Sequence, residues 1–464
     1  MDDRQNCLPL ALRDSATLRS SRSQSYRFVI VGAGLAGSLM AIHLAARGHQ
    51  VEVYERRPDP RMPGAVDHGR SINLGLSQRG VRALDGVGLL DAVMPYTVPM
   101  RGRVIHRRDG GQTFQPYGTR DDQILHSIRR TDLSAVLIER AESYPSVRFC
   151  FDTAFTRLDA DKPVVYVTDP DGAELRVTAD AVIGADGVFS AVRQQMQHGE
   201  RADYAQEFLP WGYKEVTIPA ASPLEALHVW PGDRGLIVAH PNQDGSLTGT
   251  VFLPLDGPHS LATLREPEQI RAFFAAEFPD TLELMPDLVA EFRRNPTGTL
   301  VTIRTAPWHR RDQVVLVGDA AHAVYPFYGQ GMNAAFEDCA VLDDCLGEHP
   351  TDLGAAFAAY QQRRKRHTDV LATLSTENFV DLRRRVRSPL HRARRRADLA
   401  LNRLFPDSWV PLYTMVSHTS MPYADAMARA RRQDTALTWL GLGAVAAVAA
   451  LSTYGARRRS GRGR

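Results

Sequence analysis

The chain has 464 residues, 44% of them hydrophobic and 23% charged, and a formal net charge of +3. This length is more than one hydrophobic core usually serves, so we expect two or three lobes and exclude a lone small binding module; the composition also excludes wholesale disorder, collagen-like repeats and a polytopic membrane protein. The four scattered cysteines form no CxxC pair, which argues against a disulfide scaffold and a zinc or iron–sulfur site and indicates reduced thiols in a cytosolic-type compartment.

Two arginine-rich runs account for the positive charge. Residues 383–396 contain eight arginines and residues 455–464 contain five, with no acidic residue in either run. Such runs attract nucleic acid or anionic lipid. However, no aromatic residues interleave with the arginines of the first run, as a base-stacking platform would need. We therefore interpret that run as a solvated helix face and predict no nucleic-acid partner.

The first ordered elements are predicted to form a βαβ unit. Residues 1–25 are polar and lack an apolar period, so we expect a disordered arm there. The apolar run at residues 28–31 predicts a buried strand, followed by an amphipathic helix that extends to about Arg47 and is ended by Gly48. Residues 51–54 predict a second strand.

A glycine motif occupies the turn between the first strand and the helix. Gly32, Gly34 and Gly37 form a GxGxxG pattern. In this pattern the first glycine allows a tight turn, the second lets the backbone approach a pyrophosphate, and the third packs the helix against the strand. Glu55 follows the second strand, 21 positions after Gly34, and can accept hydrogen bonds from ribose hydroxyls. The unit predicts dinucleotide binding but does not distinguish FAD from NAD.

Later segments favour a flavin. Residues 183–187 form another glycine-and-acid turn, in which Asp186 follows a predicted strand. Asp319 follows the buried strand at residues 314–317 and can bind the ribityl hydroxyls of a flavin. Residues 330–333 then open a long helix, whose backbone N–H groups can face a flavin carbonyl. We interpret the nearby His322 as a structural histidine rather than an acid–base catalyst.

The remaining segments predict a separate sheet and a helical end. Residues 204–254 contain alternating strand-like stretches, which predict an antiparallel sheet. Residues 333–403 show a helical pattern that is broken at Pro350 and Pro389. Residues 435–456 carry no charged side chain and just reach the ~20 residues that a helix needs to span a bilayer. We predict a membrane anchor there, with a helix docked on the protein itself as the alternative.

The segments around Asp186, Asp319 and residues 330–333, in this order and spacing, resemble those of the single-component FAD-dependent aromatic hydroxylases of the para-hydroxybenzoate hydroxylase type. Other segments narrow the resemblance to the kynurenine 3-monooxygenase family, over about residues 26–427. These segments are GRSINL at 69–74, PMRGR at 99–103, PYGT at 116–119, PFYGQGMN at 326–333 and PLYTMV at 411–416. The chain departs from the family pattern at Tyr328 and at Asp381, where the family form carries Glu.

The resemblance implies an α/β fold with a Rossmann-type FAD-binding lobe, an antiparallel β-sheet substrate lobe and a helical C-terminal region. The expected boundaries are a disordered arm at 1–25, an FAD-binding lobe with inserted substrate-contacting segments at 26–200, a β-sheet substrate lobe at 201–300, a return to the FAD lobe at 301–345, a C-terminal helical region at 346–430, a membrane-associated helix at 435–456 and a basic tail at 457–464.

The resemblance also implies the binding residues. The residues expected to hold FAD are Gly32, Gly34, Ala36, Gly37, Glu55, Arg56, Arg130, Asp186, Asp319, Met332 and Asn333. Arg103 and Tyr117 would bind a substrate carboxylate, and Asn378 and Tyr413 would complete that site. The residues expected to form an apolar wall around the substrate ring are Phe252 and Phe327. The spacing alone gives no reason to choose Arg103 over Arg101.

The implied reaction is the hydroxylation of L-kynurenine to 3-hydroxy-L-kynurenine, with FAD as cofactor, NADPH as co-substrate and O2 as oxidant, through a C4a-hydroperoxyflavin. No side-chain nucleophile or metal is needed, because the cofactor carries the difficult step. The alternatives are a related FAD hydroxylase acting on another aromatic acid or a tryptophan-derived intermediate, and a catalytically silent flavoprotein or membrane-bound scaffold. We expect a cytoplasmic catalytic body with membrane contact through residues 435–456.

Overall fold

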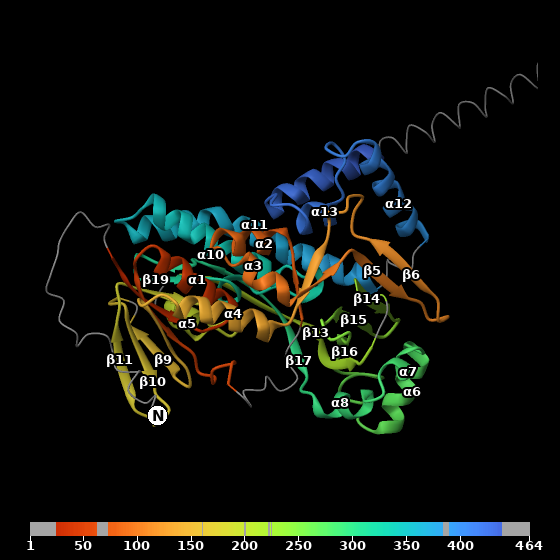
Figure 1. Ribbon diagram of the computed structural model, residues 1–464, viewed down its shortest axis with the longest axis horizontal. Helices are drawn as coiled ribbons and strands as arrows, with labels where there is room; N and C mark the ends of the chain where they lie inside the picture. The colour runs from red at the N-terminus through yellow and green to blue at the C-terminus, as the bar shows by residue number, and fades with distance from the viewer. Residues whose placement is uncertain are drawn as a thin grey trace, which may run out of the picture.

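The computed structural model describes residues 25–62, 73–159, 161–198, 201–220, 223, 225–383 and 389–438 (Figure 1). The predicted arm apart from Ser25, nearly all of the predicted membrane segment and the whole basic tail lie outside these residues. Within the described ranges, no helix combines the length and the hydrophobicity needed to cross a membrane.

A six-stranded sheet forms the centre of the first lobe and confirms the predicted βαβ opening. Its order is β18-β19-β12-β1-β2-β8, and every neighbouring pair is parallel except β18 with β19. The strands are β1 (Arg27–Val31), β2 (Gln50–Tyr54), β8 (Val147–Cys150), β12 (Ala181–Gly184), β18 (His309–Arg310) and β19 (Val314–Leu316). The apolar run predicted as the first strand is fully buried in β1, because helices cover this parallel sheet.

Helices pack around this sheet. The helix α1 (Leu35–Ala46) follows the glycine turn and ends where Gly48 adopts a positive φ of 84°, as predicted. It contacts α4 (Arg130–Glu142) and α10 (Gly331–Glu348), and α10 also contacts α2 (Gln78–Gly86). Short elements complete the lobe. They are β3 (Leu74–Leu76), β4 (Thr97–Met100), β7 (Leu125–Ile128), β9 (Ala154–Asp159), β10 (Val164–Thr168), β11 (Glu174–Thr178), α3 (Leu90–Val93), η3 (Met94–Tyr96), α5 (Ala191–Gln197) and α9 (Asp319–His322).

A seven-stranded sheet forms the second lobe, in the order β17-β13-β16-β15-β14-β5-β6. Its strands are β5 (Gly102–His106), β6 (Gln112–Pro116), β13 (Asp203–Ile218), β14 (Ala226–Pro231), β15 (Leu236–Pro241), β16 (Leu247–Pro254) and β17 (Gly298–Ala306). The sheet is antiparallel apart from the pair β14 and β5, which is parallel. The strands β5 and β6, whose residues precede the predicted sheet in the sequence, therefore extend that sheet at one edge.

The two faces of this sheet have different partners. Alternate residues such as Trp230 and Ile237 pack on the helices α6 (Pro267–Glu277), α7 (Thr281–Leu284) and α8 (Leu288–Arg294). The residues between them, such as Val229 and Phe252, pack instead with Phe327 and Phe379. This division follows from the strand period of two, and it leaves one face available for a site between the lobes.

One long helix, α11 (Leu353–Arg383), connects the two lobes (Figure 1). Near its start, the Tyr360 hydroxyl donates to the carbonyl of Leu316 in the first sheet at 3.3 Å. Near its end, Phe379 lies edge-on to Trp211 of the second sheet, with 5.2 Å between ring centres. The helices α12 (Pro389–Leu404) and α13 (Leu412–Ser417) follow. The predicted helical pattern and its break at Pro350 are thus confirmed, whereas the predicted break before Pro389 falls on residues 384–388, which lie outside the described residues.

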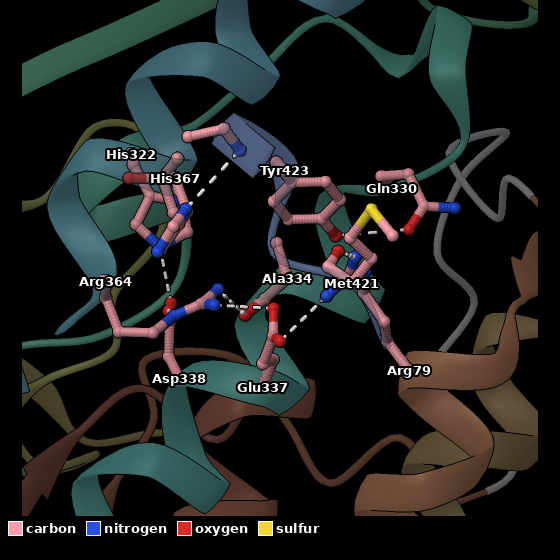
Figure 2. A network of polar contacts seen from close by, with 12 residues as sticks. Arg79, His322, Gln330, Ala334, Glu337, Asp338, Arg364, His367, Met421 and Tyr423 are labelled. Atoms are coloured by element: carbon pink, nitrogen blue, oxygen red, sulfur yellow. Dashed lines mark hydrogen bonds and ion pairs between the residues drawn. The ribbon is translucent and has the colours of Figure 1, made fainter. Parts of the chain in front are cut away.

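A buried carboxylate, that of Asp338 on α10, anchors the elements around the first sheet (Figure 2). It accepts hydrogen bonds from Arg364 Nε at 2.7 Å, from the backbone N–H of Gly318 at 3.1 Å, and from His322 Nε2. Burial alone would raise the pKa of Asp338, but His322 and Arg364 lower it below its ordinary value. The structural interpretation of His322 agrees with this geometry, since its ring lies against this carboxylate inside the protein.

The same network reaches the C-terminal segment (Figure 2). Glu337 accepts hydrogen bonds from both Arg364, at 2.5 Å, and Arg79 of α2, at 2.8 Å. The guanidinium of Arg79 lies 4.0 Å from the ring centre of Tyr423, whose hydroxyl donates to Gln330 Oε1 at 3.2 Å. The start of α10 is therefore braced from two sides.

We expect Asp338→Ala to lower the free energy of unfolding by about 3–5 kcal/mol, because removing one partner of a buried ion pair leaves the other uncompensated. Chemical denaturation followed by circular dichroism would measure this change. Asp369→Ala is a matched control on α11, since Asp369 forms a partly exposed pair with Lys365 and should change stability by less than about 0.5 kcal/mol. Equal effects of the two substitutions would contradict the anchoring role of Asp338.

Candidate flavin and substrate site

The glycine turn between β1 and α1 is shaped for close approach of a ligand. A Cβ on Gly37 would collide with the carbonyl of Gly32, and a Cβ on Gly32 would lie 2.6 Å from the carbonyl oxygen of Ala185. These two glycines are therefore required by packing. A Cβ on Gly34, in contrast, would meet no atom of the described residues within 4 Å, as expected of the glycine that a pyrophosphate approaches.

The N-terminus of α1 suits an anion. No described side chain caps the helix, and its first turn carries no acidic residue, so its backbone N–H groups and dipole can interact with a phosphate. Glu55 lies beside the turn, where it accepts hydrogen bonds from the N–H of Ala33 at 3.0 Å and from Arg57 Nε at 2.9 Å. Burial alone would raise the pKa of Glu55, but the contacts with Arg57 and Ala33 lower it. Glu55 is therefore ionised at neutral pH.

Three of the predicted flavin segments meet at one point of the fold. A Cβ placed on Gly318 would lie 3.2 Å from the Cβ atoms of both Ala36 and Ala335. Hence α1, the turn before Asp319 and the start of α10 lie against one another. Asp319 is exposed at the first position of α9, and Met332 is half-buried in the first turn of α10. Both side chains are accessible to a cofactor held at this junction.

Other predicted cofactor residues already have partners within the protein. Asp186 accepts hydrogen bonds from the N–H groups of Ala191 and Val192, at 2.7 and 3.1 Å, and so caps α5. The Asn333 amide accepts from the N–H of Ser77 and donates to the carbonyl of Gly75, both at 2.9 Å. At Asn333 the backbone therefore remains for a cofactor, while the side chain links α10 to β3.

Arg56 and Arg130 lie on the surface. Arg56 follows β2 and Arg130 is the first residue of α4, and both are exposed. Their contribution to cofactor binding stays a prediction.

A cavity between the lobes brings together all six residues predicted to bind the substrate. They come from β5, the segment after β6, β16, the 3-10 turn η4 (Pro326–Tyr328), α11 and α13. In chain order they are Arg103, Tyr117, Phe252, Phe327, Asn378 and Tyr413. Segments separated by up to 310 residues in the sequence therefore line one cavity.

Arg103 provides a buried positive charge at this cavity. Its guanidinium carbon lies 4.9 Å from the ring centre of Tyr413 and 5.6 Å from that of Tyr117. Its Nε is buried and has no hydrogen-bond partner in the described part of the chain. Among the described residues that line the cavity there is no Asp or Glu. A buried guanidinium in such surroundings favours an anionic ligand, because an uncompensated buried charge is costly.

The structure separates Arg103 from Arg101, which sequence spacing left equivalent. The side chain of Arg101 is 52% exposed and pairs with Glu225 at 2.8 Å, whereas Arg103 is buried at the cavity. In one regular strand, residues 101 and 103 would point to the same side. However, β5 begins at Gly102, so Arg101 lies before the strand and is not bound by its alternation.

Aromatic side chains form the other end of the cavity. The ring centres of Phe252 and Phe327 lie 5.0 Å apart, and those of Phe327 and Phe379 lie 4.4 Å apart. The Asn378 amide donates to the carbonyl of Phe327 at 2.6 Å, so Asn378 fixes the turn that carries this ring. Burial raises the pKa of Tyr328, whose ring stacks on Tyr413, and its hydroxyl is neutral at neutral pH.

Several cavity residues escaped the sequence analysis. They are Gly75, Met100, Leu125, Leu227, Val229, Val238, His240, Thr250, Pro326, Tyr328, Gly329 and Leu382. Most are apolar, and nothing in the sequence distinguishes a residue that lines a cavity from one in the core. His240 is different, because it is a histidine on the same strand face as the buried Leu236 and the partly buried Val238. A polar residue in an apolar alternation was the signal that could have found it.

We expect Gly34→Val to weaken FAD binding about tenfold or more while the fold is retained, because the new side chain enters the ligand's space and its Cβ meets no atom of the described chain within 4 Å. Flavin absorbance of the purified protein and its circular dichroism would measure the two effects. Gly86→Val is a matched control, since a Cβ there also meets no atom within 4 Å and Gly86 lies at the far end of α2. Full FAD content in Gly34→Val would contradict the assigned approach.

Comparisons with known proteins agree with this geometry. A family model described as an FAD binding domain matches residues 25–373. Among solved structures, 2-methyl-3-hydroxypyridine-5-carboxylic acid oxygenase is similar, with a TM-score of 0.63, 23% identity, and coverage of 79% of this chain and 95% of that chain. The probable FAD-dependent monooxygenase PqsL from Pseudomonas aeruginosa also has a TM-score of 0.63 and 23% identity, covering 78% of this chain and 98% of that one. These structures show the same fold.

Curated relatives are considerably more similar in sequence. Kynurenine 3-monooxygenase of Salinispora arenicola is 59% identical, over 94% of this chain and 98% of that protein. The enzyme of the same name from Myxococcus xanthus is 43% identical, over 87% of this chain and 88% of that protein. FAD is therefore the cofactor for which the glycine turn and the junction around Gly318 are built. The chain belongs to the FAD-dependent aromatic monooxygenases, within the kynurenine 3-monooxygenase family.

Proposed function

We propose that this protein hydroxylates L-kynurenine to 3-hydroxy-L-kynurenine, with NADPH and O2 as co-substrates. The observation that carries the proposal is the cavity with the buried guanidinium of Arg103 beside the stacked rings of Tyr117 and Tyr413 and an aromatic wall around Phe327. Kynurenine combines a carboxylate with an aromatic ring, and these two ends of the cavity match its two ends. The names of relatives that are up to 59% identical support the same substrate.

Arg103 is the residue that would hold the carboxylate. A guanidinium offers several N–H donors in a fixed plane and pairs with a carboxylate through two parallel hydrogen bonds. Tyr117 and Tyr413 stack on each other beside this group and limit where the carboxylate can lie. Asn378 acts on the substrate through the turn that it holds, since its amide nitrogen already bonds to the backbone of Phe327.

The cavity walls orient the ring and exclude water. Phe252, Phe327, Leu227 and Val238 line the cavity, and an aromatic ring gains free energy by packing against such side chains. The chemistry that bound FAD supplies is its own reduction by a pyridine nucleotide and the activation of O2. One oxygen atom enters the ring, the other leaves as water, and NADPH provides the two electrons that balance this. A dry cavity favours transfer to the ring over loss of the oxidant to solvent.

The decisive experiment is product analysis of the purified, FAD-loaded protein with L-kynurenine, NADPH and O2. We expect 3-hydroxy-L-kynurenine in amounts close to the NADPH consumed. Anthranilate and other aromatic acids serve as competing substrates in parallel reactions. Hydroxylation of one of these acids with no reaction of kynurenine would instead favour a related hydroxylase. If no substrate leads to NADPH consumption or to a hydroxylated product, the result would favour a catalytically silent flavoprotein.

We expect Arg103→Ala to weaken kynurenine binding by about 2–5 kcal/mol, the range for truncating one partner of a buried, hydrogen-bonded charge pair. Titration of the flavin fluorescence with kynurenine would measure the dissociation constant. Arg101→Ala is the matched control, because Arg101 is exposed and paired with Glu225, and it should leave the affinity unchanged. FAD content should stay the same in both variants. Unaltered affinity in Arg103→Ala would reject Arg103 as the carboxylate partner.

A further inference from the structure

His240 is a polar residue among apolar neighbours at the substrate cavity. It lies on β15 and lines the cavity together with Leu227, Val238 and Thr250. Its Nδ1 atom is buried and has no hydrogen-bond partner in the part of the chain that the structure describes. A buried polar atom without a partner costs free energy, so a group that pairs with it only in the complex would stabilise that complex.

Another histidine of the same sheet, His228, has both ring nitrogens paired within the protein. His228 lies on β14 and faces the opposite side of the sheet, where its Nδ1 is 2.9 Å from His106 Nε2 and its Nε2 is 2.9 Å from the carbonyl oxygen of Pro223. Both of its ring nitrogens are used within the protein. His240 differs from it in facing the cavity with an unused nitrogen.

The sheet register places His240 at a defined distance from the carboxylate site. Arg103 on β5 lies opposite Leu227 on β14, and His228 lies opposite Ala239 on β15. By continuation of this antiparallel register, Leu227 lies opposite His240. Figure 1 shows β5, β14 and β15 side by side. Since neighbouring strands lie about 4.8 Å apart, the backbones of Arg103 and His240 are separated by about 10 Å.

The imidazole of His240 is neutral at neutral pH, since burial lowers its pKa to about 4. A neutral imidazole offers one hydrogen-bond acceptor and one donor. With the substrate carboxylate at Arg103, the neighbouring α-amino group stays at the same end of the cavity. The polar group of kynurenine that lies farthest from the carboxylate is the amine on the aromatic ring.

We propose that His240 forms a hydrogen bond with the ring amine of the aromatic substrate and thereby selects rings that carry an amine beside the ketone. This inference rests on the proposed function. The substrate would then have two polar contacts, its carboxylate with Arg103 and its ring amine with His240. The ring carbon next to the amine, where hydroxylation occurs, then has a fixed position in the cavity.

The test compares two ligands in three proteins. The ligands are L-kynurenine and 2-amino-4-oxo-4-phenylbutanoate, which is the same molecule with hydrogen in place of the ring amine. The proteins are the FAD-loaded wild type, His240→Leu and His240→Asn, and flavin fluorescence gives each dissociation constant. We expect His240→Leu to weaken kynurenine binding about 5- to 50-fold and to change binding of the amine-free ligand less than about twofold. His240→Asn, which keeps a donor and an acceptor, should retain part of the preference.

Two further variants separate this role from general effects. His228→Asn changes a buried histidine on the opposite face and should leave the ratio of the two dissociation constants unchanged. Arg103→Ala should weaken both ligands alike, because both carry the carboxylate. An equal change for both ligands in His240→Leu, or no change for either, would overturn the role of His240 while kynurenine binding by the wild type stands. Failure of the wild type to bind kynurenine would overturn the proposed function itself.

Discussion

The arrangement of the flavin site depends on one buried carboxylate. Asp338 has no exposed side-chain surface and holds Arg364 of α11, His322 of α9 and the backbone of Gly318 at once. An ionised carboxylate is stable inside a protein only with such complete pairing. Because Asp338 lies on α10, the same contacts fix the start of that helix relative to the turn that carries Asp319.

The helix α11 connects this buried carboxylate with the substrate cavity. A helix of 31 residues is about 46 Å long, and Arg364 holds it near the flavin junction while Asn378 and Phe379 act at its other end. The position of the cavity relative to the FAD-binding lobe is therefore set by α11. This suits a monooxygenase, in which the ring to be hydroxylated has to be held at a set place relative to the cofactor.

The cavity itself departs from the rules that stabilise a core. Arg103 and His240 both have buried ring or guanidinium nitrogens without partners in the described chain, although the surrounding residues are well packed and apolar. Unsatisfied buried polar atoms are rare in proteins and lower stability. Such atoms also occur elsewhere in the described chain, for example Arg79 Nε and Arg193 Nε. Arg103 and His240 differ from these in lining one cavity, where a bound ligand can complete their hydrogen bonds.

Local sequence determined the elements and the motif chemistry, whereas only the tertiary structure decided which side chains remain for ligands. The glycine turn, β1, α1 and the break at Pro350 follow from short-range backbone preferences, so they could be predicted. Distinguishing Arg103 from Arg101, finding His240, and learning that the Asn333 amide is used within the protein required the packed chain. These properties depend on contacts between residues far apart in sequence, and no local pattern encodes such contacts.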